Sequence, residues 1–171
     1  LAAHTLKLIG QKVSKNALRH EVETFTDKIY TCVIPRDLHY IRERARRRGD
    51  KSVSAVAAFL GKALNIIPVI FGQGVEGKPV AKTRNFDMAV EKVMNYAVAR
   101  VEAGLLTPYV SLSCGLSWTE IEDLPGLNRL RDACEQNGVE LLLSQMGITS
   151  AIYVGPGSIC LALAAEPHEF S

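Results

Sequence analysis

The stretch Leu64-Asn65-Ile66-Ile67-Pro68-Val69-Ile70-Phe71 decides the fold that this sequence predicts. Its apolar part is short, rich in β-branched side chains and followed by the glycine-rich segment Gly74-Val75-Glu76-Gly77, which is typical of a buried strand that turns into a second strand. The second strand is predicted over Lys78 to Arg84 and ends with two cations. We therefore expect a rigid sheet that delivers two basic side chains to one edge, where they can hold an anion.

The segments on both sides of this hairpin alternate between predicted helices and predicted strands. Ser14 is a candidate N-cap for an amphipathic helix over 15–28, and Asn85 is a candidate N-cap for a long helix that ends at Gly104. Further helices are expected over 1–9, 36–48, from Ser52 or Ser54 to Leu64, and over 126–136. Further strands are expected over 30–34, 109–114, 139–144, 151–154 and 159–165, and a loop over 115–125.

The last two predicted strands follow one another with only a short turn between them. Together with the alternating elements before them, this pair indicates an α/β (or α+β) fold, a mixed sheet packed by helices. With 171 residues, of which 47% are hydrophobic, the chain can bury one core of ordinary size, or one core plus a fragment of another domain. Because Leu1 falls inside a predicted helix, we expect residues 1–29 to be a helical remnant of a preceding domain or a linker, and residues 30–171 to form the α/β domain.

Composition gives no indication of a nucleic-acid-binding protein, a membrane-spanning protein or a protein with a cysteine-based metal site. The net charge of +2 is too small to indicate nucleic-acid binding. No signal peptide is evident, and no apolar run reaches the roughly 18 to 20 residues that a membrane span needs, so we expect a soluble, cytoplasmic protein. The cysteines are far apart, without CxxC spacing or a nearby histidine, and are interpreted as buried free thiols; they are Cys32, Cys114, Cys134 and Cys160.

Motifs for catalysis are missing from the sequence as well. The four histidines are scattered over separate predicted elements, and no HExxH, GxSxG, Walker A or GxGxxG motif is present. Glu120 and Glu122 fall in a predicted loop, where solvated carboxylates are expected rather than an acid–base pair. We therefore expect no enzyme, no catalytic residue and no metal site.

A basic segment lies between the first predicted strand and the central hairpin. Its seven cations are Arg36, Arg42, Arg44, Arg46, Arg47, Arg48 and Lys51, and its three anions are Asp37, Glu43 and Asp50. No aromatic residue follows Tyr40 in this segment for base stacking. We interpret the segment as a solvated helix face, with a surface for phosphate or for an acidic partner as the alternative.

The segment Ile152-Tyr153-Val154-Gly155-Pro156-Gly157-Ser158 is the second informative feature. Two glycines around a proline let the backbone pass close to a ligand and can turn N–H groups toward an anion, and Ser158 adds a hydroxyl. The same composition also suits a purely structural hairpin turn. The residues alone leave both interpretations open.

The order of these features resembles the C-terminal portion of the DegV family of fatty-acid-binding proteins. The motifs that carry the resemblance, over roughly residues 12–165, are Asp37-Leu38-His39-Tyr40-Ile41, Leu60-Gly61, Leu64-Asn65-Ile66-Ile67-Pro68-Val69-Ile70, the Gly77 turn, Lys82-Thr83-Arg84 and Gly155-Pro156-Gly157. The resemblance implies the C-terminal domain of a two-domain carrier that holds one fatty acid between two α/β domains. It further implies that a separate kinase phosphorylates the carboxyl group, and that the carrier itself catalyses nothing.

The resemblance also implies a site. Arg84 would lie near the headgroup or the kinase-facing surface, where an arginine can form a charge-assisted hydrogen bond with a carboxylate or a phosphate. Gly155, Pro156 and Gly157 would form the turn that borders the headgroup. We therefore expect a long-chain fatty acid as ligand, no cofactor, and a rim of ligand-binding residues made of Arg84, Tyr153, Gly155, Pro156, Gly157 and Ser158.

Departures from the family pattern motivate a second hypothesis. Tyr153 stands where family members usually have a histidine, and Arg46-Arg47-Arg48-Gly49-Asp50 replaces the usual Gly-Gly-Arg. We also expect the family's N-terminal domain to be missing from this sequence and to be needed for the full site. The alternative is a regulatory or interaction module that has lost the ligand and contacts an acidic partner through the surface from Arg42 to Lys51. A third hypothesis is an enzyme related to small-molecule kinases that uses the glycine turn for phosphate.

Overall fold

The computed structural model describes residues 1–37, 66–73 and 76–171. Within these ranges, strands form one sheet in the order β3-β2-β1-β6-β4-β5. The strands are β1 (Ile29–Ile34), β2 (Ile67–Gln73), β3 (Glu76–Thr83), β4 (Tyr109–Cys114), β5 (Glu140–Gln145) and β6 (Ile159–Ala164). β4 and β5 pair in parallel and the other neighbours pair antiparallel, which confirms the predicted mixed sheet.

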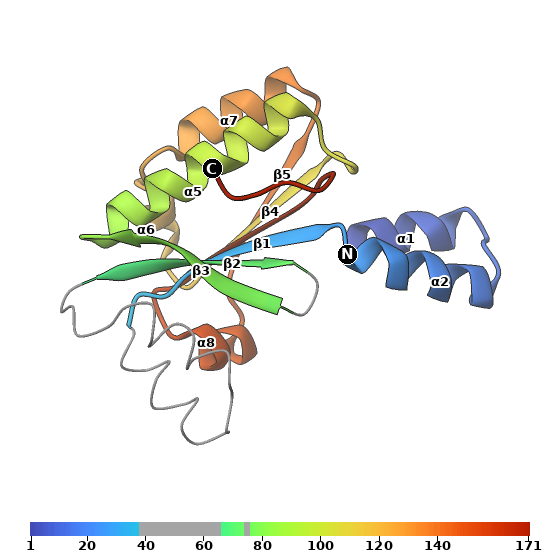
Figure 1. Cartoon of the computed structure of the whole chain (residues 1–171), viewed down its shortest axis with the longest axis horizontal. Coiled ribbons are helices and arrows are strands. Elements are labelled where there is room, and N and C mark those ends of the chain that lie inside the picture. Colours follow the sequence, from blue (N-terminus) through green and yellow to red (C-terminus); the bar gives the residue numbers. More distant parts are fainter. Residues whose placement is uncertain (38–65, 74–75) are drawn as a thin grey trace.

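Helices lie on both sides of this sheet and beyond one of its ends (Figure 1). They are α1 (Ala2–Gly10), α2 (Lys15–Thr26), α5 (Phe86–Ala103), α6 (Trp118–Glu122), α7 (Leu127–Gln136) and α8 (Ile148–Val154). The side chains of Ser14 and Asn85 accept hydrogen bonds from the N–H groups of Ala17 (3.3 Å) and Met88 (2.9 Å), so both predicted helix starts are confirmed. Figure 1 shows α5 and α7 together on one side of the sheet and α8 on the other side. No helix in the described ranges combines the length and the apolar character that crossing a membrane requires.

The core lies between the sheet and the layer formed by α5 and α7. Val90 and Val93 of α5 are fully buried against this face. The strands present Cys32, Leu112 and Leu161 to the same layer, and none of these side chains is exposed. Because burial of apolar surface contributes roughly 25 cal/mol per Å², this layer is the main source of hydrophobic stabilisation.

The opposite face of the sheet carries smaller side chains that are only partly buried. The register places them in two neighbouring rows across β1, β6 and β4: Thr31, Ala162 and Ser111 in one row, and Val33, Cys160 and Ser113 in the next. α5 and α7 do not cover these rows (Figure 1). A pocket of about 150 Å³ lies against part of this face, beside α1. The two faces of the sheet therefore differ in both burial and side-chain size.

One edge of the sheet gathers segments that are far apart in the sequence. The register pairs Ile159, at the start of β6, with Ile34 at the end of β1 and with Cys114 at the end of β4. Ile67 at the start of β2 pairs with Thr83 at the end of β3. The residues that follow β1, β3 and β4 and those that precede β6 therefore meet at this edge. We call it the glycine-turn edge, because the segment Gly155 to Ser158 lies on it.

The first two helices form a hairpin that extends from the opposite end of β1 (Figure 1). The rings of His4 and Phe25 stack at a centroid distance of 3.9 Å and join α1 to α2. Neither helix contributes a fully buried residue. The division of the chain at residue 29 stays a prediction.

The prediction of a loop over 115–125 was wrong, because this segment contains α6. The hydroxyl of Ser117 accepts a hydrogen bond from the N–H of Glu120 (3.3 Å), and the Glu120 carboxylate accepts one from the N–H of Ser117 (2.8 Å). This capping box satisfies two N–H groups that a helix start otherwise leaves unpaired. It is enough to begin a helix in a sequence without strong apolar periodicity.

The prediction of a strand over 151–154 was also wrong, because these residues belong to α8. β6 lies between β1 and β4 and pairs with both, so it has no free edge for a strand formed by the residues just before it. The chain forms a short helix instead, which ends at Gly155 with φ of 92°, a conformation that glycine adopts without strain. The turn predicted at Gly74 and Val75, and the helices predicted over 36–48 and from Ser52 or Ser54, lie outside the described residues except for Arg36 and Asp37.

Candidate functional site

The predicted site residues all come from segments at the glycine-turn edge. Arg84 directly follows β3 and has an exposed side chain. Tyr153 lies in the last turn of α8, with 49% of its surface exposed, whereas Ser158 is fully buried. The sheet therefore explains how Arg84 and Tyr153, 69 positions apart in the sequence, come to one edge. Their exposed side chains form a rim, and the buried Ser158 supports it.

Ser158 belongs to the buried support of this edge. Its hydroxyl donates to the carbonyl oxygen of Val154 at 2.7 Å and accepts a hydrogen bond from the backbone N–H of Arg36 at 3.2 Å. These two contacts join the end of α8 to the residues that follow β1. The hydroxyl predicted to face a ligand thus has a structural role in the conformation observed.

The glycine turn is held by hydrogen bonds to its own surroundings. The N–H of Gly155 donates to the carbonyl of Ala151 (2.8 Å), and the N–H of Gly157 donates to the carbonyl of Gly115 (3.0 Å). Pro156 has no N–H group. These N–H groups are therefore already satisfied, and a bound anion needs a side chain for its main contact.

Arg36 provides a cation at this turn, and the sequence analysis did not assign it to the site. A Cβ placed on Gly157 would lie 3.0 Å from Cγ of Arg36, so the arginine stem runs directly over the turn. The guanidinium carbon lies 4.4 Å from the centroid of the Phe86 ring, at the first turn of α5. Such stacking fixes the position of a planar cation at a partly exposed surface. Arg36 thus connects the glycine turn with Phe86, the first residue of α5, which lies two residues after Arg84 in the sequence.

An acidic side chain, Glu120, lies near the Arg36 cation. Hydrogen bonds from Ser117 lower the pKa of the exposed Glu120 carboxyl, and the positive charge of Arg36 lowers it further. Glu120 and Arg36 therefore belong to one electrostatic neighbourhood. The cations predicted from Arg42 to Lys51 lie outside the described residues.

Burial favours the protonated form of the cysteine thiols. All four are free, as predicted. Burial raises the pKa of Cys114 to about 12, and burial also raises the pKa values of Cys32 and Cys160. These thiols therefore remain protonated and pack as apolar side chains. Across the ranges that the structure describes, no three potential metal ligands come together.

The family model described as "Uncharacterised protein, DegV family" matches residues 1–166. A DegV domain-containing protein of Xanthomonas axonopodis pv. citri is 40% identical over 170 residues, and one of Xanthomonas campestris pv. campestris is 39% identical over 170 residues. Each comparison includes 99% of this chain and 54% of the relative, so the chain spans about half the length of the curated relatives it matches. The chain belongs to the DegV family.

Solved DegV structures share the fold. DegV, a fatty acid binding protein from Bacillus subtilis, has a TM-score of 0.70 at 16% identity, with 95% of this chain and 54% of that chain covered. A DegV family protein from Thermus thermophilus has a TM-score of 0.68 at 20% identity, with 95% and 55% covered. The Fatty Acid Kinase (Fak) B3 protein of Streptococcus pneumoniae has a TM-score of 0.70 at 14% identity, with 96% and 54% covered. These likenesses confirm the predicted fold class.

Proposed function

We propose that this chain binds a long-chain fatty acid without covalent attachment and presents its carboxylate to a partner kinase. Relatives of the same fold include a protein from Eubacterium eligens loaded with heptadecanoic acid, a stearic acid-binding protein from Eubacterium ventriosum, and the Fak B3 protein loaded with linoleic acid. The name of the last protein motivates the kinase partner. The chain has a binding role in this proposal and performs no catalytic step.

The half-buried face of the sheet is the part of the molecule that suits the hydrocarbon tail. Thr31, Ser111 and Ala162 are small, so a chain can lie close to the backbone of three neighbouring strands. Each buried CH₂ group contributes roughly 0.8 kcal/mol. A tail of a dozen or more carbons therefore needs no strong polar contact along its length.

The glycine-turn edge suits the carboxylate end. Arg36 supplies a cation fixed by its contacts with Gly157 and Phe86, and we propose that it acts together with Arg84 and the hydroxyl of Tyr153. In this proposal Gly155 and Pro156 border the headgroup, and Gly157 and Ser158 hold Arg36 in place. One observation carries the proposal: the half-buried face of small side chains ends at the glycine-turn edge, where the Arg36 guanidinium stacks on the Phe86 ring.

The complete site in this proposal needs more than the described residues. We propose that residues 30–171 are the C-terminal domain of a two-domain carrier and that residues 1–29 belong to the connection with the preceding domain, which supplies the second wall of the acyl site. The chain covers 54% of the length of each relative, which leaves room for such a domain in proteins of this family. We also place the carrier in the cytoplasm, because a reducing compartment keeps free thiols such as the four found here in their reduced form.

Native mass spectrometry with defined ligands tests the role of Arg36. The delipidated protein is reloaded with palmitic acid or with uncharged methyl palmitate, and the bound fraction is compared between the parent and Arg36→Gln. We expect the variant to lose about tenfold in affinity for palmitate, the size of one charge-assisted hydrogen bond, with little change for the methyl ester. Arg19→Gln, on the exposed surface of α2, serves as the matched control.

Equal losses for both ligands would show that Arg36 supports the fold and does not contact the carboxylate. A folded parent protein that binds neither ligand contradicts the carrier proposal and favours the interaction module. For that alternative, a salt-sensitive pull-down that disappears when Arg46, Arg47 and Arg48 are reversed in charge is the positive result.

A further inference from the structure

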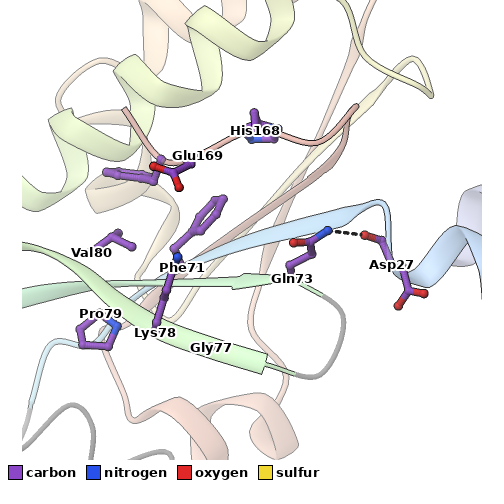
Figure 2. Close-up of a pocket in the computed structure, with 10 residues that line it drawn as sticks. Asp27, Phe71, Gln73, Gly77, Lys78, Pro79, Val80, His168 and Glu169 are labelled. Carbon is purple, nitrogen blue, oxygen red and sulfur yellow. Dashed lines mark hydrogen bonds between the residues drawn. The ribbon is translucent and has the colours of Figure 1, made fainter.

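A second pocket, of about 870 Å³, lies at the end of the sheet opposite the glycine-turn edge. Phe71 and Gln73 come from the end of β2, and Lys78 and Val80 come from β3. Another wall is the segment after β6, which passes over β2 (Figure 2), and the centroids of its His168 and Phe170 rings lie 6.1 and 5.6 Å from that of Phe71. The volume falls within the range of about 300 to 1,000 Å³ that is usual for small-molecule sites.

The segment after β6 is fixed at this position by an aromatic cluster. The Phe170 ring lies 4.9 Å from Tyr96 and 5.6 Å from Phe71 between centroids, and the His168 ring lies 4.1 Å from Tyr30. The hydroxyl of Tyr96 bonds Nε2 of His168 at 2.7 Å, while Nδ1 of His168 lies 2.7 Å from the carbonyl oxygen of Glu166. Because that carbonyl can only accept, Nδ1 carries the proton and Nε2 accepts from Tyr96. The aromatic cluster thus holds the floor and one wall of the pocket in place.

Two opposite charges face each other across this aromatic floor. Lys78 is the direct cross-strand partner of Phe71, so both side chains project from the same face of the sheet. In Figure 2, Lys78 rises from β3 and Glu169 descends from the segment after β6, with the Phe71 ring between them. Among the described contacts neither Lys78 nor Glu169 forms an ion pair, and both side chains are exposed.

We propose that this pocket binds a small zwitterion with an apolar body, of the class of hydrophobic α-amino acids. Its carboxylate pairs with the Lys78 ammonium, its ammonium pairs with the Glu169 carboxylate, and its side chain lies against the partly buried Phe170 and Val80. A simple anion would meet the repulsion of Glu169, and a simple cation would meet that of Lys78. An uncharged apolar ligand would displace water from Lys78 and Glu169 without offering hydrogen bonds in its place, and this desolvation costs free energy.

The amide of Gln73 and the carboxylate of Asp27 mark the outer limit of this pocket. Nε2 of Gln73 donates to the backbone carbonyl of Asp27 at 2.8 Å, which ties the end of β2 to the residues before β1. The Asp27 carboxylate points away from Phe71 in Figure 2. Among the charged side chains that line the pocket, Lys78 and Glu169 therefore face its inner part, and the Lys92 ammonium lies 6.0 Å from the centroid of the Phe170 ring.

Calorimetric titration with L-phenylalanine and its two half-ligands tests this proposal. 3-Phenylpropionate lacks the amine and 2-phenylethylamine lacks the carboxylate, so each keeps the apolar body and one charge. We expect saturable binding of L-phenylalanine and binding at least about tenfold weaker for each half-ligand, since each has lost one charged hydrogen bond. Lys78→Gln should weaken binding of L-phenylalanine and of 3-phenylpropionate, whereas Glu169→Gln should weaken binding of L-phenylalanine and of 2-phenylethylamine.

Controls separate binding from folding. Lys15→Gln, on the exposed surface of α2, should leave all three affinities unchanged. The far-ultraviolet circular dichroism of Lys78→Gln and Glu169→Gln should match that of the parent, because both side chains are exposed. The proposal is overturned when L-phenylalanine shows no saturable binding, when all three ligands bind equally, or when the two folded variants bind like the parent. Palmitate binding, measured in parallel, tests the fatty-acid site at the glycine-turn edge. Its result does not depend on whether the second pocket binds L-phenylalanine.

Discussion

At the scale of single residues, Gly157 is the position on which the glycine-turn edge depends most directly. Its φ of 74° lies in the left-handed region, which costs a residue with a Cβ about 1 kcal/mol or more. Its N–H holds the carbonyl of Gly115, and its Cα hydrogen faces the stem of Arg36. Any side chain at this position therefore strains the backbone and also displaces the cation of the site.

Gly157→Ala and Gly138→Ala form a matched pair that separates these two effects. Gly138 also has a left-handed φ, 64°, but a Cβ there would meet no atom within 4 Å, whereas on Gly157 it would lie 3.0 Å from Arg36. We expect both variants to lose about 1 kcal/mol in urea unfolding from backbone strain. Gly157→Ala should lose more, and it alone should also lose palmitate affinity.

Equal unfolding free energies and equal palmitate affinities for the two variants would contradict the contact between Gly157 and Arg36. A smaller loss for Gly157→Ala than for Gly138→Ala would contradict it as well.

The candidate site could be predicted from the sequence only in part, and the reason lies at this scale. The glycines around Pro156 stand out in the sequence because few other residues suit such a turn. Arg36 does not stand out, because its place beside Gly157 follows from the pairing of β1 with β6. Its N–H bonds Ser158, a residue 122 positions away. No local pattern carries that information.

At the scale of elements, α6 shows how a few hydrogen bonds decide between a helix and a loop. Ser117 and Glu120 exchange the hydrogen bonds of a capping box, and Arg131 holds Glu122 through two contacts of 2.6 and 2.7 Å. Strands with clear apolar alternation, such as β1 and β4, were predicted correctly because each buries every second residue. α6 and α8 were missed because capping and the lack of a free strand edge outweighed local composition.

The capping box gives α6 a dependence on pH whose sign follows from Glu120. Hydrogen bonds from Ser117 lower the pKa of Glu120 in the folded protein, so the ionised carboxylate stabilises the fold above the ordinary glutamate pKa of about 4.3. This contribution is lost as the pH falls through the lowered, folded-state pKa. We expect the unfolding free energy of Glu120→Gln to fall less between pH 6 and pH 3 than that of the parent, with the exposed Glu102→Gln as the control.

Ser117→Ala removes the other half of the same box. We expect a loss of about 1 kcal/mol at pH 7, and the variant should resemble Glu120→Gln in its weaker response to acid. Parallel acid curves for the parent, Glu120→Gln and Ser117→Ala would show that the capping box does not contribute to the stability of α6.

At the scale of the whole molecule, the sheet separates two ends with different chemistry. The glycine-turn edge carries Arg36 and the residues around it, and the other end carries the pocket between β3 and the segment after β6. The α1–α2 hairpin extends from this second end and buries no residue completely. The hydrophobic core between the sheet and α5 contains no residue of this hairpin.

Two truncations test how far each terminal segment supports that core. A variant without residues 1–26 should remain folded, with a melting temperature within about 5 °C of the parent, because α1 and α2 contribute no fully buried side chain. A variant without residues 167–171 should lose more, since it gives up the Tyr96–His168 hydrogen bond and the packing of Phe170. Calorimetry of both variants measures this, and the reverse order would contradict the assignment of residues 1–29 to a separate unit.

The place of β6 in the middle of the sheet also has a consequence during synthesis. β1 is made early, but one of its two neighbours, β6, is the last of the described strands to leave the ribosome. Until Ile159–Ala164 emerge, β1 and β4 each present an unpaired side of the kind that invites pairing with other chains. The nascent polypeptide therefore depends on rapid completion, or on a chaperone, for longer than a protein whose strands pair in the order in which they are translated.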